Sequence, residues 1–157
     1  MKTCSYAAGA LAAVSLLACA VEKKPPVVES GKAIVQAYVD AWNRHDSVAI
    51  DTLLAPNAVH EDFAQNFRGR GSAQIVKFMR QTVVTQPDFK WEVTNSIEEG
   101  REVALEWKWT ATYSGPDLRG NPITNRRISG RGASFAEVEN RKVKRITDYF
   151  DLASLFR

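Results

Sequence analysis

The sequence is poor in cysteine: its two cysteines, Cys4 and Cys19, both lie within the first nineteen residues. If that segment is removed up to Cys19 and Cys19 carries a lipid, the mature chain has neither a free thiol nor a disulfide. A catalytic cysteine, a thiolate metal site and a disulfide framework are then excluded. The apolar run from Ala7 to Leu17 is too short to span a membrane as a stable helix.

Signals for cofactors and nucleic acid are also lacking. The stretches Gly69-Arg70-Gly71 and Gly130-Arg131-Gly132 do not have the glycine spacing of phosphate-binding loops. His60 and Asp62 have no third ligand at a spacing typical of a metal site. Basic residues mostly alternate with acidic ones, which favours a solvated sheet face over a nucleic-acid surface. We therefore expect no cofactor, no metal and no nucleic-acid partner.

The amino terminus has the features of an export signal. Lys2 precedes the apolar run, and Leu16-Leu17-Ala18-Cys19 resembles the lipobox of bacterial lipoproteins. We expect residues 1–19 to be a signal peptide ending in the lipidation site Cys19, and residues 20–30 to be a tether. The protein would then lie in the bacterial cell envelope, attached to a membrane by its lipid anchor alone. Ala18-Cys19-Ala20 also fits ordinary secretory cleavage, which would release a soluble secreted or periplasmic protein.

The remaining residues, 31–157, suffice for one domain with one core. Apolar residues recur with a helical period over residues 33–45, 47–54 and 72–85. A short strand is expected over residues 58–63 and a loop over residues 67–71. Thereafter the period is two, which predicts antiparallel strands over residues 89–98, 103–113, 128–138 and 143–150. In the first of these, Ile97 is expected to face inward and Glu98 outward.

Asp148 is the most unusual residue of the last predicted strand. Alternation places it on the same face as Ile146 and Phe150, which is the apolar face. A carboxylate there must be paired, hydrogen-bonded or held neutral, because the burial of a bare charge is costly. It is therefore either a general acid or base in an apolar pocket or a structural hydrogen-bond acceptor.

Four stretches in order resemble the SnoaL-like polyketide cyclases of the nuclear transport factor 2-like superfamily. They are Tyr38-x-x-x-Trp42-Asn43-x-x-Asp46, residues 55–63, Gly115-Pro116 with Gly120-x-Pro122, and Asp148-Tyr149-Phe150-Asp151. The resemblance implies an α+β fold in which a curved, mostly antiparallel mixed sheet wraps around amino-terminal helices as a cone. It also implies an apolar pocket at the open end of the cone.

The resemblance implies roles for particular residues as well. Asp148 matches the aspartate that acts as acid and base in the cyclases. His60 and Asp62, two residues apart on one strand face, match polar pocket positions and are expected to hold or polarise a ligand carbonyl. Tyr38, Trp42, Trp107 and Trp109 are the expected ligand-binding residues, with Trp107 and Trp109 as an aromatic wall. Core packing is the alternative role for Tyr38 and for at least one of these two tryptophans. Epoxide hydrolases of the superfamily carry an arginine and an aspartate where this chain has Trp107 and Trp109, so that activity is excluded.

Two functions agree with these observations. The first is an exported protein that binds a small apolar, carbonyl-bearing molecule and acts as a cofactor-free cyclase, isomerase or lyase. The second is a non-catalytic ligand-binding or assembly domain at the cell envelope. By resemblance, we also expect a homodimer formed through the outer face of the sheet.

Overall fold

The computed structural model describes residues 30–156. The predicted signal peptide, Cys19 and nearly all of the predicted tether lie outside this range. Helix α1 spans Gly31–Asn43, α2 spans Ser47–Leu53 and α3 spans Ser72–Thr85. The strands are β1 (Leu54–Asp62), β2 (Phe67–Arg70), β3 (Lys90–Glu99), β4 (Glu102–Pro116), β5 (Pro122–Glu139) and β6 (Lys142–Phe150), and a 3-10 helix, η1 (Leu152–Phe156), follows.

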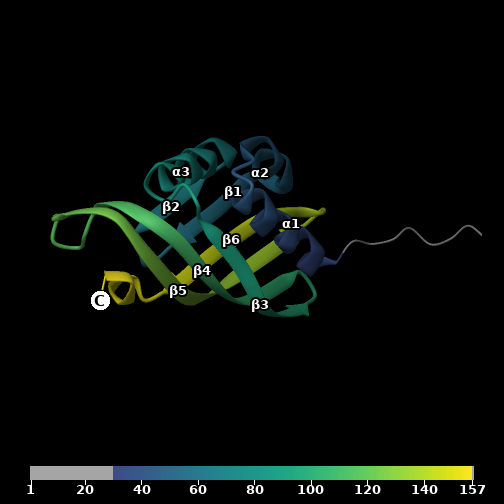
Figure 1. The fold of residues 1–157 in the computed structure, drawn as a ribbon. Coiled ribbons are helices and arrows are strands. Elements are labelled where there is room, and N and C mark those ends of the chain that lie inside the picture. Colours follow the sequence, from purple (N-terminus) through teal and green to yellow (C-terminus); the bar gives the residue numbers. More distant parts are fainter. Residues whose placement is uncertain (1–29, 157) are drawn as a thin grey trace, which may run out of the picture.

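The six strands form one mixed sheet in the order β2-β1-β6-β5-β4-β3. The β1–β6 pair is parallel, whereas the other neighbouring strands run antiparallel. The sheet curves, with the helices on its inner side, and the β4–β5 hairpin extends beyond them next to η1 (Figure 1). This confirms the predicted α+β fold.

The core lies between the helices and the inner face of the sheet. Helix α1 turns a stripe of buried residues toward this face: Ile34, Val35, Tyr38, Val39, Ala41 and Trp42. Alternate residues of β4, such as Val103, Leu105 and Trp107, are buried on the same side. The helical period of 3.6 and the strand period of two therefore place the predicted apolar sets in one core. None of the helices between residues 30 and 156 combines the length and apolar character needed to cross a bilayer.

Two local predictions were wrong. Residues 67–70 form β2 rather than a loop, because they pair antiparallel with β1 at the edge of the sheet. In β3 the register shifts between Val93 and Asn95. An extra residue of this kind moves every later side chain to the opposite face. Ile97 is therefore 65% exposed, and Glu98 turns toward α1.

Glu98 completes the start of α1. Its carboxylate accepts hydrogen bonds from the backbone N–H groups of Gly31 (2.7 Å) and Lys32 (3.2 Å). The first N–H groups of a helix lack partners within the helix, and a negative charge is favourable there. Glu98 thus ties α1 to β3 at the end of the sheet opposite the β4–β5 turn.

Candidate functional site

Asp148 and His60 form a buried pair at the centre of the sheet. Strands β1 and β6 run parallel, and their register places His60 opposite Ile146 and Asp62 opposite Asp148. Nε2 of His60 lies 2.8 Å from Oδ2 of Asp148. Asp148 is 7% exposed and His60 is 1% exposed, so this interaction is shielded from bulk water. Two of the predicted site residues, from strands far apart in the chain, are thus in direct contact.

Tyr38 lies behind this pair rather than in a ligand-binding wall. Its hydroxyl is 3.2 Å from Nδ1 of His60, and its side chain is fully buried. Tyr38 is not among the residues that line the cavity described below, so the structure gives no support to the expectation that it contacts a ligand. Burial, with the nearby negative charge of Asp148, raises the pKa of Tyr38. Tyr38 therefore keeps its proton and can donate it to Nδ1, which leaves the His60 proton on Nε2, facing Asp148.

A second arm of hydrogen bonds reaches Asp148 from β4 and β5. The hydroxyl of Ser134 donates to Oδ1 of Asp148 at 2.5 Å, and Nε1 of Trp107 donates to Oγ of Ser134 at 2.7 Å. Ser134 is fully buried and lies opposite Asp148 in the β5–β6 register. Ser134 cannot be recognised as a site residue from the sequence, because its relevance depends on this strand pairing. The sequence indicates only that Ser134 lies on the same strand face as Ala136, which is a sign that it is buried.

Asp62 lies beside Asp148 on the next strand. Its two carboxylate oxygens accept hydrogen bonds from the backbone N–H of Gln65 (2.9 Å) and from the Gln65 side-chain amide (2.6 Å). Burial, the largest influence, raises the pKa of Asp62, and the charge of Asp148 adds to this. The Gln65 hydrogen bonds and the His60 charge act in the opposite direction. The site therefore holds two carboxyl groups in different environments.

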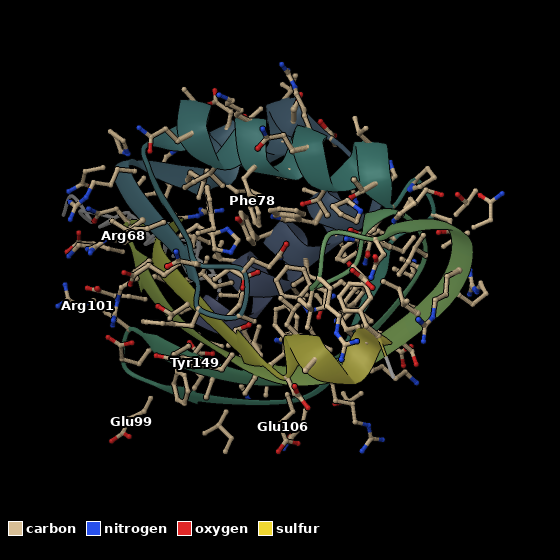
Figure 2. All side chains as sticks on the ribbon, turned by 90° about the vertical axis from the view of Figure 1, so that its left-hand side faces the viewer. Arg68, Phe78, Glu99, Arg101, Glu106 and Tyr149 are labelled. Carbon is tan, nitrogen blue, oxygen red and sulfur yellow. The ribbon has the colours of Figure 1, made fainter. Side chains whose placement is uncertain are left out.

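These residues lie on a cavity of about 300 Å³ between the helices and the inner sheet face. Six of the predicted site residues line it: His60, Asp62, Asp148, Trp42, Trp107 and Trp109. The rim includes Leu118 from the β4–β5 turn and Leu152 from η1. Figure 2 looks at this end of the molecule, where Phe78, which also lines the cavity, reaches inward from α3, while Tyr149 points away from the outer sheet face.

Tryptophan side chains form much of the cavity wall. Trp91 from β3 packs edge to face against Trp107 from β4, with ring centroids 5.8 Å apart. Gly130 and Gly132 on β5 lie opposite Trp109 and Trp107 in the register. A Cβ atom at Gly132 would lie 2.4 Å from the Trp107 ring, and one at Gly130 would lie 2.8 Å from Trp109. The two glycines therefore provide the space in which the indoles lie against the sheet.

This geometry suits proton transfer inside an apolar cavity. Asp148 is a carboxylate held by a hydroxyl and an imidazole, and it can accept a proton from a ligand that fills the space beside it. Within residues 30–156, no group of three or more histidine, cysteine or acidic side chains is placed to hold a metal ion. The described residues thus offer acid–base groups and aromatic walls.

Comparisons with solved structures place the fold among known proteins. AclR of Streptomyces galilaeus, suggested to be a hydroxylase, is 29% identical over 80% of this chain and 92% of its own, with a TM-score of 0.67. A SnoaL-like polyketide cyclase from Agrobacterium tumefaciens is 19% identical over 82% of this chain and 97% of its own, with a TM-score of 0.69. A protein from Catenulispora acidiphila with a ketosteroid isomerase-like fold, in complex with trimethylamine, is 20% identical over 78% of this chain and 88% of its own, with a TM-score of 0.69.

A comparison with curated protein sequences gives no match. The family model described as SnoaL-like polyketide cyclase matches residues 32–157, which include every strand and helix described above except the first residue of α1, Gly31. The chain therefore belongs to the SnoaL-like polyketide cyclase family.

Proposed function

We propose that this protein binds a small, apolar, carbonyl-bearing molecule and moves a proton at the carbon next to the carbonyl group. Such a step is shared by cofactor-free cyclisation and isomerisation. The observation that carries the proposal is the position of Asp148, which lines an aromatic cavity while Ser134 and His60 hold its two oxygens. A carboxylate held in position beside a bound ligand can act as a general base.

In this proposal Asp148 accepts the proton and later returns it to another position of the ligand. His60 keeps the Asp148 carboxylate oriented, and Tyr38 keeps His60 in the tautomer that donates to Asp148. Asp62 lies beside Asp148 on the cavity wall and is the second acid–base group available to the ligand, with a pKa that is raised chiefly by burial. The tryptophan walls exclude water and orient a flat ligand.

Deuterium exchange tests this function without knowledge of the natural substrate. The protein is incubated with 4-tert-butylacetophenone in D₂O, and deuterium at the carbon next to the carbonyl is followed by mass spectrometry. Wild-type protein should accelerate exchange above the buffer rate. Asp148→Asn should lower the acceleration roughly 100-fold or more, since a general base contributes about that much. Asp51→Asn, a change at an exposed aspartate of α2, is the matched control and should exchange like wild type.

The second candidate function is ligand binding without catalysis. It is favoured by the complete hydrogen bonding of Asp148, because both of its oxygens already have protein donors. A structural carboxylate would be held in the same way. Ketone binding by wild type and by Asp148→Asn with equal affinity, together with no exchange above buffer, would support this candidate and overturn the catalytic one.

We also propose a homodimer formed through the outer face of the sheet. Phe63, Phe135 and Tyr149 are 61%, 52% and 46% exposed. Phe63 stacks on Tyr149 with centroids 5.1 Å apart, and Phe135 lies edge-on to the same ring at 6.1 Å. A contiguous exposed aromatic cluster of this kind is typical of an interaction surface. Light scattering should give twice the chain mass for wild type and the single-chain mass for the double variant Phe135→Glu, Tyr149→Glu.

Attachment to the cell envelope remains a proposal from the sequence. It depends on the segment Leu16-Leu17-Ala18-Cys19, which precedes the described residues. Intact-mass measurement of protein purified from membranes tests it. A chain that begins at Cys19 and carries the added mass of a lipid is expected, whereas an unmodified chain beginning at Ala20 or later would contradict the lipid anchor.

A further inference from the structure

Among residues 30–156, the residues that line the cavity include Asp62, Asp117 and Asp148 but no lysine and no arginine. The carboxylate of Asp117 accepts hydrogen bonds from Arg119 and Asn121 of the β4–β5 turn. The guanidinium of Arg126 contacts the backbone oxygen of Phe156 at 3.4 Å, but Arg126 is not a lining residue. His60 is the one basic side chain among the described residues of the wall, and its two ring nitrogens are already engaged by Tyr38 and Asp148.

The neutral part of the wall is aromatic on several sides. The lining includes Trp42 from α1, Trp91 from β3, and Trp107 and Trp109 from β4. Trp91 stands nearly perpendicular both to Trp42, at 85°, and to Trp107, at 82°. Indole faces attract cations more strongly than the rings of tyrosine or phenylalanine, and the attraction grows when water is excluded.

An enolate in this cavity would have no lysine or arginine beside it among the described lining residues. When Asp148 removes a proton from a neutral ketone, the negative charge moves to the ligand, and no lysine or arginine of the lining within residues 30–156 stabilises it. A positive charge on the ligand itself would stabilise both states: it would be attracted to the Asp148 carboxylate before transfer and to the enolate afterwards. The aromatic wall and the carboxyl groups therefore favour the same kind of ligand.

We propose that the cavity selects a small organic cation, with a tertiary or quaternary ammonium group on the same molecule as the carbonyl. This inference rests on the proposed function, since it names the class of ligand for the same site. The ammonium group lies against the tryptophan faces, within reach of the field of Asp62 and Asp148. A volume of about 300 Å³ is at the lower end for ligand pockets, which fits a molecule with one or two rings.

Two ketones of matched shape test the proposal. In 4-(trimethylammonio)acetophenone a positively charged nitrogen replaces the central carbon of the tert-butyl group of 4-tert-butylacetophenone. Calorimetric titration of the full domain should give an affinity at least tenfold higher for the cation. Asp62→Asn and Asp148→Asn should each lower the affinity for the cation at least threefold, without a comparable loss for the neutral ketone. Asp51→Asn should change neither affinity. Equal or tighter binding of the neutral ketone, or no binding of either, would overturn the proposal.

Exchange measurements separate this proposal from the function on which it rests. Each exchange rate is divided by the rate of the same ketone with acetate ion, which corrects for the acidifying effect of the ammonium group. Preferential binding of the cation with no enzymatic exchange of either ketone would support the ligand class and overturn the catalytic function. Exchange that depends on Asp148 but shows no preference for the cation would support the catalytic function and overturn the ligand class.

Discussion

The hydroxyl of Tyr38 on α1 lies 3.2 Å from Nδ1 of His60 on β1, on the opposite side of the imidazole from Asp148. The amino-terminal helix thereby takes part in the site without reaching the cavity. A buried hydroxyl in this position fixes which ring nitrogen carries the proton, and the orientation of His60 follows from it. The consequence for chemistry is a carboxylate whose imidazole partner is held in one tautomer.

Tyr38→Phe tests this relationship. The variant keeps the ring but leaves Nδ1 of His60 without a donor, so the other tautomer becomes accessible. We expect exchange to fall about fivefold, which corresponds to one hydrogen bond of ~1 kcal/mol, and the pH profile of exchange to change shape. Ketone affinity should change less than twofold, because Tyr38 does not line the cavity. An unchanged pH profile would show that Tyr38 serves packing alone.

Ser134→Ala removes a residue that joins two buried groups. Oδ1 of Asp148 loses its 2.5 Å donor and Nε1 of Trp107 loses its 2.7 Å acceptor. Each unsatisfied buried group costs about 1–3 kcal/mol, so the free energy of unfolding should fall by roughly 2–6 kcal/mol in urea titrations. Ser129→Ala is the control, since Ser129 is exposed on the same strand. A loss no larger than that of the control would mean that water replaces the hydroxyl.

Gly132→Ala should disturb the tryptophan wall. The added Cβ would lie 2.4 Å from Trp107 and 2.5 Å from the backbone oxygen of Tyr149. Because a backbone atom cannot rotate away, we expect a loss of roughly 1–3 kcal/mol in unfolding free energy, as for overpacked cores. Gly130→Ala meets only the side chains of Trp109 and Leu155 at its nearest contacts. It should be the milder variant in thermal unfolding, and the reverse order would contradict this reading of the wall.

Asp62→Asn should reveal the cost of the buried charge. Since burial raises the pKa of Asp62 in the folded protein, the folded state holds this proton more tightly than the unfolded chain does. This tighter proton binding stabilises the folded protein fully at pH values below the pKa of Asp62 in the unfolded chain. The stabilisation is lost as the pH rises through the pKa of Asp62 in the folded protein. Asparagine resembles the protonated form, so the variant should be more stable than wild type at pH 7. The difference should shrink toward pH 3.

Chemical denaturation at several pH values between 3 and 7 measures this effect. Asp51→Asn is again the control, because Asp51 is exposed on α2. An Asp62→Asn variant that is less stable than wild type at pH 7 would show that the Gln65 hydrogen bonds outweigh the burial of the charge.

The sequence by itself determined the properties that depend on side-chain period. A repeat of 3.6 places Tyr38 and Trp42 on the inward stripe of α1, and a repeat of two places Asp148 with Ile146 on the inner face of β6. The same two-residue repeat places Trp107 and Trp109 on the inner face of β4, where both line the cavity. These assignments need no knowledge of which strands pair, because side-chain direction within one element follows from backbone geometry alone.

Only the tertiary structure decided which of these residues meet. His60 and Asp148 are 88 residues apart in the chain, and they touch because β1 pairs with β6 in one particular register. Pairing of β5 with β6 also gives Ser134 its role, and the packing of α1 on the sheet places Tyr38 behind His60. The register shift in β3 reverses the faces of Ile97 and Glu98, which alternation alone assigns the other way. Pairing and register depend on the free energy of the whole sheet and its core, so no local pattern specifies them.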